Sequence, residues 1–254
     1  MNAAIYRNRG KTSLVAIFLL LVPTILSTSS CKTENSSTIM VLVDMSGTWF
    51  NNRNEAINRQ LLTKVGTGLI DAAGQYPQPI DIRYLKIGSN SYLAPPLCDV
   101  RFVPKLFSGS CSRGSKTLHK MSHPECGLRE YVVQDCLESV LHRRGEALTD
   151  ISGAFAAAAK FAQSQGYSKK SLIVLSDMIE ERKGKSIKIP DLKGFHVIIL
   201  YRHLNRHTPD MTDENLIKWE SWLKDAGVKR VTILPGLASS ADLLTTHLLQ
   251  EMQE

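Results

Sequence analysis

The stretch STIMVLVDMSGTW, residues 37–49, joins an uninterrupted apolar run to an abrupt polar end. The apolar run 39–43 is typical of a strand that is buried on both faces, as in a parallel sheet. Asp44, Ser46 and Thr48 follow at alternate positions. Open α/β sheets bind ligands at the carboxyl ends of such strands, and oxygen-bearing side chains suit Mg²⁺. The stretch therefore predicts a metal site at the end of a buried strand.

Two later segments carry polar side chains in comparable settings. Thr149 stands at the start of an Ala-rich segment with helical character, and Asp177 ends the apolar run LIVLSD, residues 172–177. Together with Asp44, Ser46 and Thr48, these segments resemble, in the same order, the metal-ion-dependent adhesion site of von Willebrand factor type A (VWA) domains. That family begins its site with Asp-x-Ser-x-Ser, and here Thr48 replaces the last Ser and keeps the hydroxyl. The resemblance covers residues 37–254.

The resemblance implies a divalent cation, Mg²⁺ or alternatively Mn²⁺ or Ca²⁺, with a distinct role for each residue. Ser46 and Thr48 would donate hydroxyl oxygens to the ion directly. Asp44 and Asp177 would act through bound water or by holding the hydroxyls, and Thr149 would add a third hydroxyl or anchor a water. It also implies an open coordination position that accepts an acidic side chain of a partner protein. Alternatively, Asp44 and Thr149 only cap a turn or a helix, as such residues often do.

The periodicity of the rest of the chain predicts an α/β fold. Strands are expected at residues 39–44, 80–87, 170–177, 195–201 and 230–234. Helices are expected at 54–75, 127–144, 150–165, 214–226 and from 238 or 239 to 252. Strands that alternate with helices form right-handed crossover units. The expected fold is therefore a doubly wound, mainly parallel sheet flanked by helices (VWA/Rossmann-like), with the strand at 80–87 near an edge.

Residues 89–127 interrupt this pattern and predict an irregular insertion that contains cysteines. The insertion is rich in Ser, Gly and Pro and has no long apolar period. We expect two disulfides, in a pairing that the sequence leaves open. The alternative is a zinc site that uses His119 and His123, but no Cys-x-x-Cys pair supports it, and export favours disulfides. The candidate cysteines are Cys98, Cys111, Cys126 and Cys136.

The N-terminal residues 1–30 have the pattern of a secretory signal. A basic segment precedes a short apolar core, and small residues lead to Cys31. Cys31 stands where a bacterial lipoprotein signal places its lipidated cysteine, and its use there leaves an even number of cysteines. The alternatives are an ordinary cleaved signal and an uncleaved anchor. The expected organisation is a signal at 1–30, a polar tether at 31–37 and a VWA-like domain at 38–254, anchored by lipid on the extracytoplasmic side of a bacterial cell envelope.

The net charge of +7 does not indicate a nucleic-acid partner. Three of the positive charges fall within residues 1–30, and the remainder form no stripe of Lys and Arg interleaved with aromatic residues. We therefore expect no nucleic-acid partner, and a mildly basic surface is the simpler interpretation.

An enzymatic function finds little support in the sequence. Asp44 followed by Ser-Gly-Thr is similar to the Asp-x-Asp-Gly-Thr motif of haloacid-dehalogenase-like phosphatases, but Ser46 stands where that family has its general acid. No phosphate-binding Gly-x-x-x-x-Gly-Lys loop and no Gly-x-Ser-x-Gly elbow occur. We expect a non-enzymatic binding domain, with a metal-independent scaffold or assembly protein of the same fold as the main alternative.

Overall fold

The computed structural model describes residues 36–47, 49, 54–102, 135–142, 145–181, 190–202, 209–236 and 240–253, with only the backbone for 209–212. Several predicted features lie outside these residues. They are the signal, nearly all of the tether, Cys31, Thr48, Cys111, Cys126, His119 and His123. Within the described residues, no helix has the length and apolar character needed to cross a membrane.

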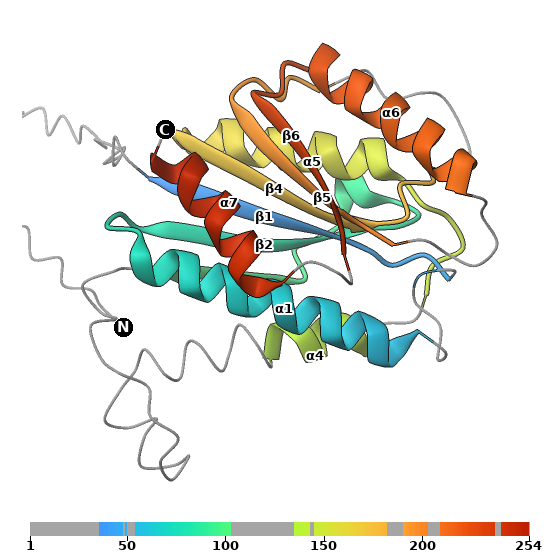
Figure 1. Ribbon diagram of the computed structural model, residues 1–254, viewed down its shortest axis with the longest axis horizontal. Coiled ribbons are helices and arrows are strands. Elements are labelled where there is room, and N and C mark those ends of the chain that lie inside the picture. The colour runs from blue at the N-terminus through green and yellow to red at the C-terminus, as the bar shows by residue number, and fades with distance from the viewer. Residues whose placement is uncertain are drawn as a thin grey trace, which may run out of the picture. The chain divides into compact units, whose positions relative to one another are not determined.

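A six-stranded sheet forms the centre of the domain (Figure 1). Its strands lie in the order β3-β2-β1-β4-β5-β6, with β3 antiparallel to β2 and the other neighbours parallel. The strands are β1 (Ser37–Asp44), β2 (Ile80–Ile87), β3 (Cys98–Phe102), β4 (Lys169–Ser176), β5 (Phe195–Tyr201) and β6 (Arg230–Pro235). The order reverses between β1 and β4, so the sheet is doubly wound, as predicted.

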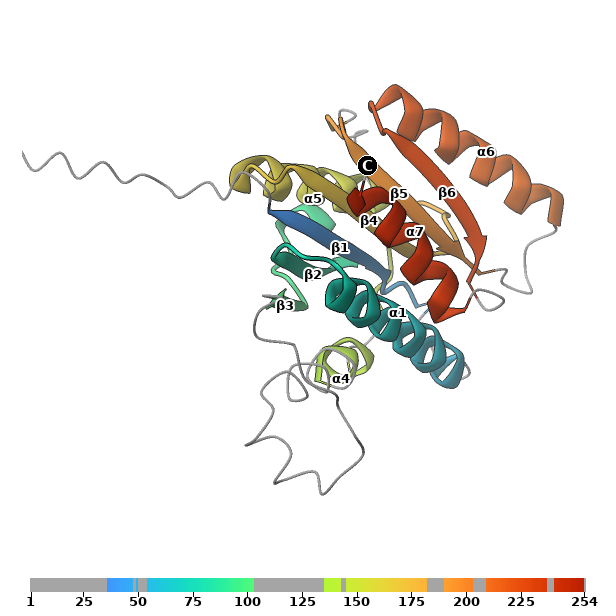
Figure 2. The same ribbon diagram turned by 60° about the vertical axis from the view of Figure 1, so that its left-hand side comes forward.

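Helices cover both faces of this sheet (Figures 1 and 2). One apolar core contains side chains of α1, α4 and α7, and the other contains side chains of α5 and α6. The helices are α1 (Glu55–Gln75), α4 (Cys136–Leu141), α5 (Ile151–Gln165), α6 (Pro209–Asp225) and α7 (Ala241–Gln253), and a short 3₁₀ turn, η1, spans Ser91–Leu93.

The sequence of β1 accounts for its central position. Every residue of β1 is buried, and its side chains alternate between the two cores. Ile39 and Val41 pack in the core with α1 and α7, whereas Met40 and Leu42 pack in the core with α5 and α6. An unbroken apolar run can satisfy both layers only in a strand that is covered on both faces.

Two features of the fold differ from the sequence-based expectations. The segment 89–127 is not wholly irregular, because η1 and β3 lie within it. The five residues of β3 alternate buried and exposed side chains, an edge-strand pattern too short to stand out among the prolines. Helix α6 begins at Pro209 rather than at 214, because Pro suits the first turn of a helix. The described part of the helix expected at 127–144 is α4.

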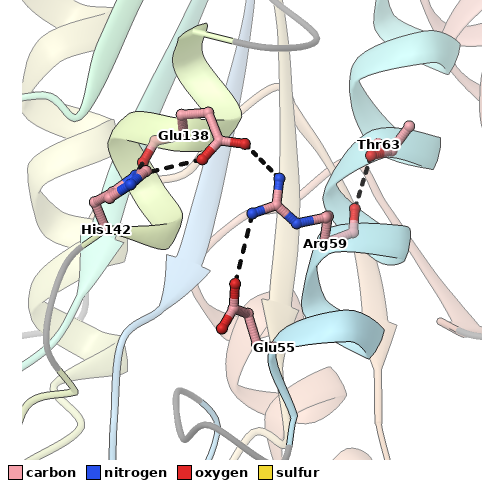
Figure 3. Close-up of polar contacts among 5 residues, drawn as sticks. All are labelled: Glu55, Arg59, Thr63, Glu138 and His142. Carbon is pink, nitrogen blue, oxygen red and sulfur yellow. Dashed lines mark hydrogen bonds and ion pairs between the residues drawn. The ribbon is translucent and has the colours of Figure 1, made fainter.

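Helix α4 is attached to the domain at two places. A disulfide joins Cys98 of β3 to Cys136 at the start of α4. On the other side of α4, Glu138 binds the guanidinium of Arg59 on α1, which also lies 3.5 Å from Glu55 (Figure 3). The hydrogen bond from Arg59 lowers the pKa of Glu138. The disulfide and the ion pair add to the burial of Leu137 and Val140 in holding this short helix against the domain.

Replacing Cys98 and Cys136 together by Ser should lower the free energy of unfolding by about 2–4 kcal/mol, because the unfolded chain loses a cross-link across 38 residues. Urea unfolding of the two proteins without reductant measures this difference. Mass spectrometry of the unreduced wild-type protein should find Cys98 linked to Cys136, with Cys111 and Cys126 as the second pair. Free thiols at all four positions, or stoichiometric zinc, would contradict the assignment.

Candidate functional site

The carboxyl ends of three adjacent parallel strands carry charged side chains. Asp44 is the last residue of β1, Asp177 follows the end of β4, and Arg202 follows the end of β5. The strand register pairs Val43 with Leu175, and Ser176 with Tyr201. Asp177 and Arg202 therefore occupy corresponding positions and Asp44 lies level with Ser176, so all three stand at one edge of the sheet.

Asp44 is completely buried, and both of its carboxylate oxygens accept hydrogen bonds. The backbone N–H of Ser46 donates to Oδ1 at 2.8 Å, and the hydroxyl of Ser176 donates to Oδ2 at 2.7 Å. Burial and the charge of Asp177 raise the pKa of Asp44 to about 7, although the bonds from Ser46 and Ser176 oppose this rise. Asp44 is thus a carboxylate whose negative charge the protein alone stabilises poorly at neutral pH.

Asp177 lies beside Asp44 in a segment whose backbone is held from α6. Its Oδ1 accepts a hydrogen bond from the N–H of Ile179 at 3.1 Å. The next residue, Met178, has a φ of 59°, which is a strained value for a side chain of this size. The carbonyl of Met178 accepts bonds from Asn215 at 2.5 Å and from the indole N–H of Trp219 at 2.7 Å. Helix α6 therefore stabilises the turn that positions Asp177.

The segment 145–150 connects the turn after β1 to the segment after β4. Glu146 exchanges backbone hydrogen bonds with Gly47 and Met45, at 2.8 and 2.6 Å. Thr149 exchanges a pair of backbone bonds with Glu181, at 2.9 and 3.0 Å. These two short bridges place the buried Thr149 at the same edge of the sheet as the two carboxylates.

Helix capping does not explain Thr149. The residue that caps α5 is Asp150, whose Oδ1 accepts a bond from the N–H of Gly153 at 3.0 Å. Asp44 does form a turn with Ser46, as the capping alternative expected. That turn leaves the burial of the carboxylate unexplained, because turn residues are usually exposed to water.

Glu146 is a further carboxylate at this edge, and cationic and backbone groups hold it. Its oxygens bind the ammonium group of Lys86 and accept a bond from the N–H of Ser89 at 2.6 Å. Burial opposes ionisation of Glu146, but these bonds prevail and lower its pKa. Glu146 is therefore charged and internally paired, so it stabilises the segment 145–150.

A buried arginine lies at the same edge of the sheet. The guanidinium of Arg202 donates a hydrogen bond to Oδ1 of Asn58 at 2.8 Å, and Asn58 donates to the carbonyl of Trp49 at 2.8 Å. The guanidinium carbon is 4.8 Å from the centre of the Trp49 ring. Burial lowers the pKa of Arg202, while the negative charges of Asp177 and Asp44 act in the opposite direction.

The structure places four of the five predicted site residues, Asp44, Ser46, Thr149 and Asp177, at the carboxyl edge. Thr48 lies outside the described residues. The sequence analysis missed Ser176 and Arg202. Ser176 precedes Asp177, and Arg202 follows the apolar run of β5. Their positions at strand ends could therefore have indicated that they belong to the site.

The donor set suits a hard cation that relies on hydroxyl and water oxygens. Two buried carboxylates repel each other, and the buried Ser46 and Thr149 contribute hydroxyl groups from separate segments. Among the described residues, no group of three or more His, Cys, Asp or Glu side chains is arranged to hold a metal ion. Carboxylate and hydroxyl oxygens are the ligand types that a hard cation such as Mg²⁺ would take.

No protein-family model and no curated protein sequence matches the chain. Among solved structures, it is similar to a von Willebrand factor type A protein from Catenulispora acidiphila, at 13% identity and a TM-score of 0.48, over 86% of this chain and 43% of that chain. The open form of the pilus adhesin SpaC from Lactobacillus rhamnosus GG gives 12% identity and a TM-score of 0.44, over 86% and 30% of the two chains.

An aerotolerance-related membrane protein from Bacteroides fragilis gives 10% identity and a TM-score of 0.40, over 85% of this chain and 98% of that chain. This chain thus spans less than half the length of the Catenulispora protein and of the adhesin. The strand order and register described above, rather than the degree of overlap, define the fold. The domain has a VWA-like α/β fold with a disulfide-bearing region at one edge of the sheet.

In chelator, the free energy of unfolding should fall by about 2–3 kcal/mol between pH 5 and pH 8 through Asp44 alone. Its pKa is about 7 in the folded protein against 3.8 for the unperturbed group, so between these values the folded state binds more protons than the unfolded state. Stability gained at low pH is therefore lost as the pH rises through 7. Urea unfolding at several pH values measures the slope.

Asp44→Asn is the matched control, because the amide keeps the shape and cannot ionise. This variant should show a much flatter dependence on pH in chelator. Its neighbours Asp177 and Arg202 remain unchanged, so any slope that persists belongs to other groups. An equally steep slope in Asp44→Asn would contradict the assignment to Asp44.

Proposed function

We propose that this domain is a non-enzymatic binding module that recognises an acidic side chain of a partner protein through a divalent cation. The observation that supports this proposal most strongly is the buried carboxylate of Asp44, which lies near Asp177 at the ends of the central strands. A buried carboxylate pair is expensive to maintain without a compensating cation. Mg²⁺ is the expected ion, and Mn²⁺ or Ca²⁺ would suit the same oxygen donors.

The residues that would hold the ion supply mostly neutral oxygens. Ser46, Thr48 and Thr149 contribute hydroxyls, while Asp44 and Asp177 contribute charge and hold hydroxyls or water. Hydroxyl and water donors neutralise little of the ion's charge, so a bound ion keeps a strong attraction for a further anionic oxygen. A carboxylate from a partner is the natural donor for that position.

The environment of Asp44 also supports binding over catalysis. A nucleophilic aspartate needs an accessible oxygen, but Asp44 is fully buried and both oxygens accept hydrogen bonds. The position two residues later is Ser46, which cannot act as a general acid near neutral pH. A phosphatase of the haloacid-dehalogenase type would need both features.

Asp44→Ala should abolish Mg²⁺ binding measured by calorimetry and the rise in melting temperature that Mg²⁺ causes. The fold should persist, because removal of the carboxylate relieves its repulsion with Asp177 and takes little from the apolar core. Asp44→Ala should capture no partner protein from solubilised envelope, whether Mg²⁺ or chelator is present.

Leu42→Ala is the control from the same strand. Leu42 is completely buried, so this change should lower the free energy of unfolding by about 2–5 kcal/mol and leave Mg²⁺ affinity intact. If Asp44→Ala binds Mg²⁺ as tightly as the wild type does, the metal-dependent mechanism is wrong.

A metal-independent scaffold of the same fold is the second candidate. Arg202 supports it, because a buried guanidinium near Asp44 and Asp177 offsets part of their charge without any ion. The two functions differ in a single measurement. Partner capture that is equal in Mg²⁺ and in chelator would favour the scaffold, whereas capture that is lost in chelator would favour the metal-dependent module.

We further propose that the domain is held at an envelope membrane by lipid on Cys31. The tether at 31–37 would then connect the lipid directly to β1, so the domain would stay close to the membrane. In a bacterial host, Cys31→Ser should move the protein from the membrane fraction to the soluble extracytoplasmic fraction. Wild-type protein that is released from membranes by salt alone would contradict lipid anchoring.

A further inference from the structure

Arg202 is a buried cation whose position is fixed by two other buried residues. It follows β5 directly and is only 6% exposed. Asn58, which is on α1, accepts its hydrogen bond and in turn donates to the backbone of Trp49. The ring of Trp49 lies against the guanidinium, and such contacts stabilise a buried cation.

The charge of Arg202 acts on the same two carboxylates that would bind the ion. The register between β4 and β5 pairs Ser176 with Tyr201, so Asp177 and Arg202 are the next residues along the two strands. The guanidinium attracts Asp177 and, more weakly, Asp44. A fixed positive charge attracts a buried carboxylate pair and so stabilises the metal-free form. The same charge repels an incoming divalent cation.

We propose that Arg202 is a resident counter-cation of the carboxylate pair, a positioning residue that keeps the metal-free domain folded and weakens its affinity for divalent metal. This inference rests on the proposed metal-dependent function and adds its regulation. A site weakened in this way holds its ion firmly only when a partner carboxylate completes the coordination. Metal and partner would then bind cooperatively, and each would raise the affinity for the other.

The test compares Mn²⁺ affinity, measured by electron paramagnetic resonance, with the melting temperature in chelator. Arg202→Gln removes the charge but keeps an amide that can donate to Asn58, and Arg202→Lys keeps the charge. Arg59→Gln is the matched control, because Arg59 neighbours Asn58 in sequence but pairs with Glu138 and Glu55 (Figure 3).

Arg202→Gln should bind Mn²⁺ about tenfold more tightly than the wild type and melt at a lower temperature in chelator. Arg202→Lys and Arg59→Gln should bind Mn²⁺ with nearly wild-type affinity. A variant that is unfolded in chelator but folded in Mn²⁺ would also support the proposal, since the ion would then replace the missing charge.

Other outcomes would overturn the inference in distinguishable ways. If the wild type binds Mn²⁺ and Arg202→Gln binds it equally or more weakly, the role of Arg202 is wrong and the metal site stands. If Arg202→Gln is unfolded with and without Mn²⁺, Arg202 only supports the structure. If neither protein binds Mn²⁺, the proposed function fails and this inference fails with it. Binding by Arg202→Gln alone would uphold the role of Arg202 as a counter-cation and overturn the metal-dependent function of the wild-type domain.

Discussion

The burial of the Asp44 carboxylate is the constraint on which the site depends. An unbroken apolar strand must be covered on both faces and therefore lies in the middle of the sheet. The residue at its carboxyl end is then buried between neighbouring strand ends. The protein surrounds that carboxylate with hydrogen bonds from Ser46 and Ser176, yet its pKa stays near 7. Hydrogen bonding alone therefore does not offset burial beside a second carboxylate, and either protonation or a nearby positive charge would reduce the remaining cost.

Two sources of positive charge can stabilise the ionised Asp44, and each repels the other. Arg202 is part of the chain, held by Asn58 and against Trp49, whereas a divalent cation would come from solution. The neighbouring segments are fixed from several directions: Met178 is held by α6, and the segment 145–150 is bridged to the turns after β1 and β4.

The region of β3 and α4 depends on different interactions. Helix α4 is short and β3 is a five-residue edge strand, and cross-links supplement the burial of Leu137, Val140 and Val100. The disulfide between Cys98 and Cys136 joins β3 to α4, and the ion pair of Arg59 with Glu138 attaches α4 to α1 (Figure 3). Cross-links of this kind suit a protein in an oxidising compartment, in agreement with the proposed location outside the cytoplasm.

The sequence by itself determined the central strands, most of the helices and the polar residues at the ends of β1 and β4, because apolar periodicity is a local property. The tertiary structure decided what depends on strand order and register. It paired Cys98 with Cys136, made Asp150 rather than Thr149 the cap of α5, and placed Ser176 and Arg202 around Asp44. Such contacts join residues far apart in the chain, and no spacing along the sequence encodes which strand ends become neighbours.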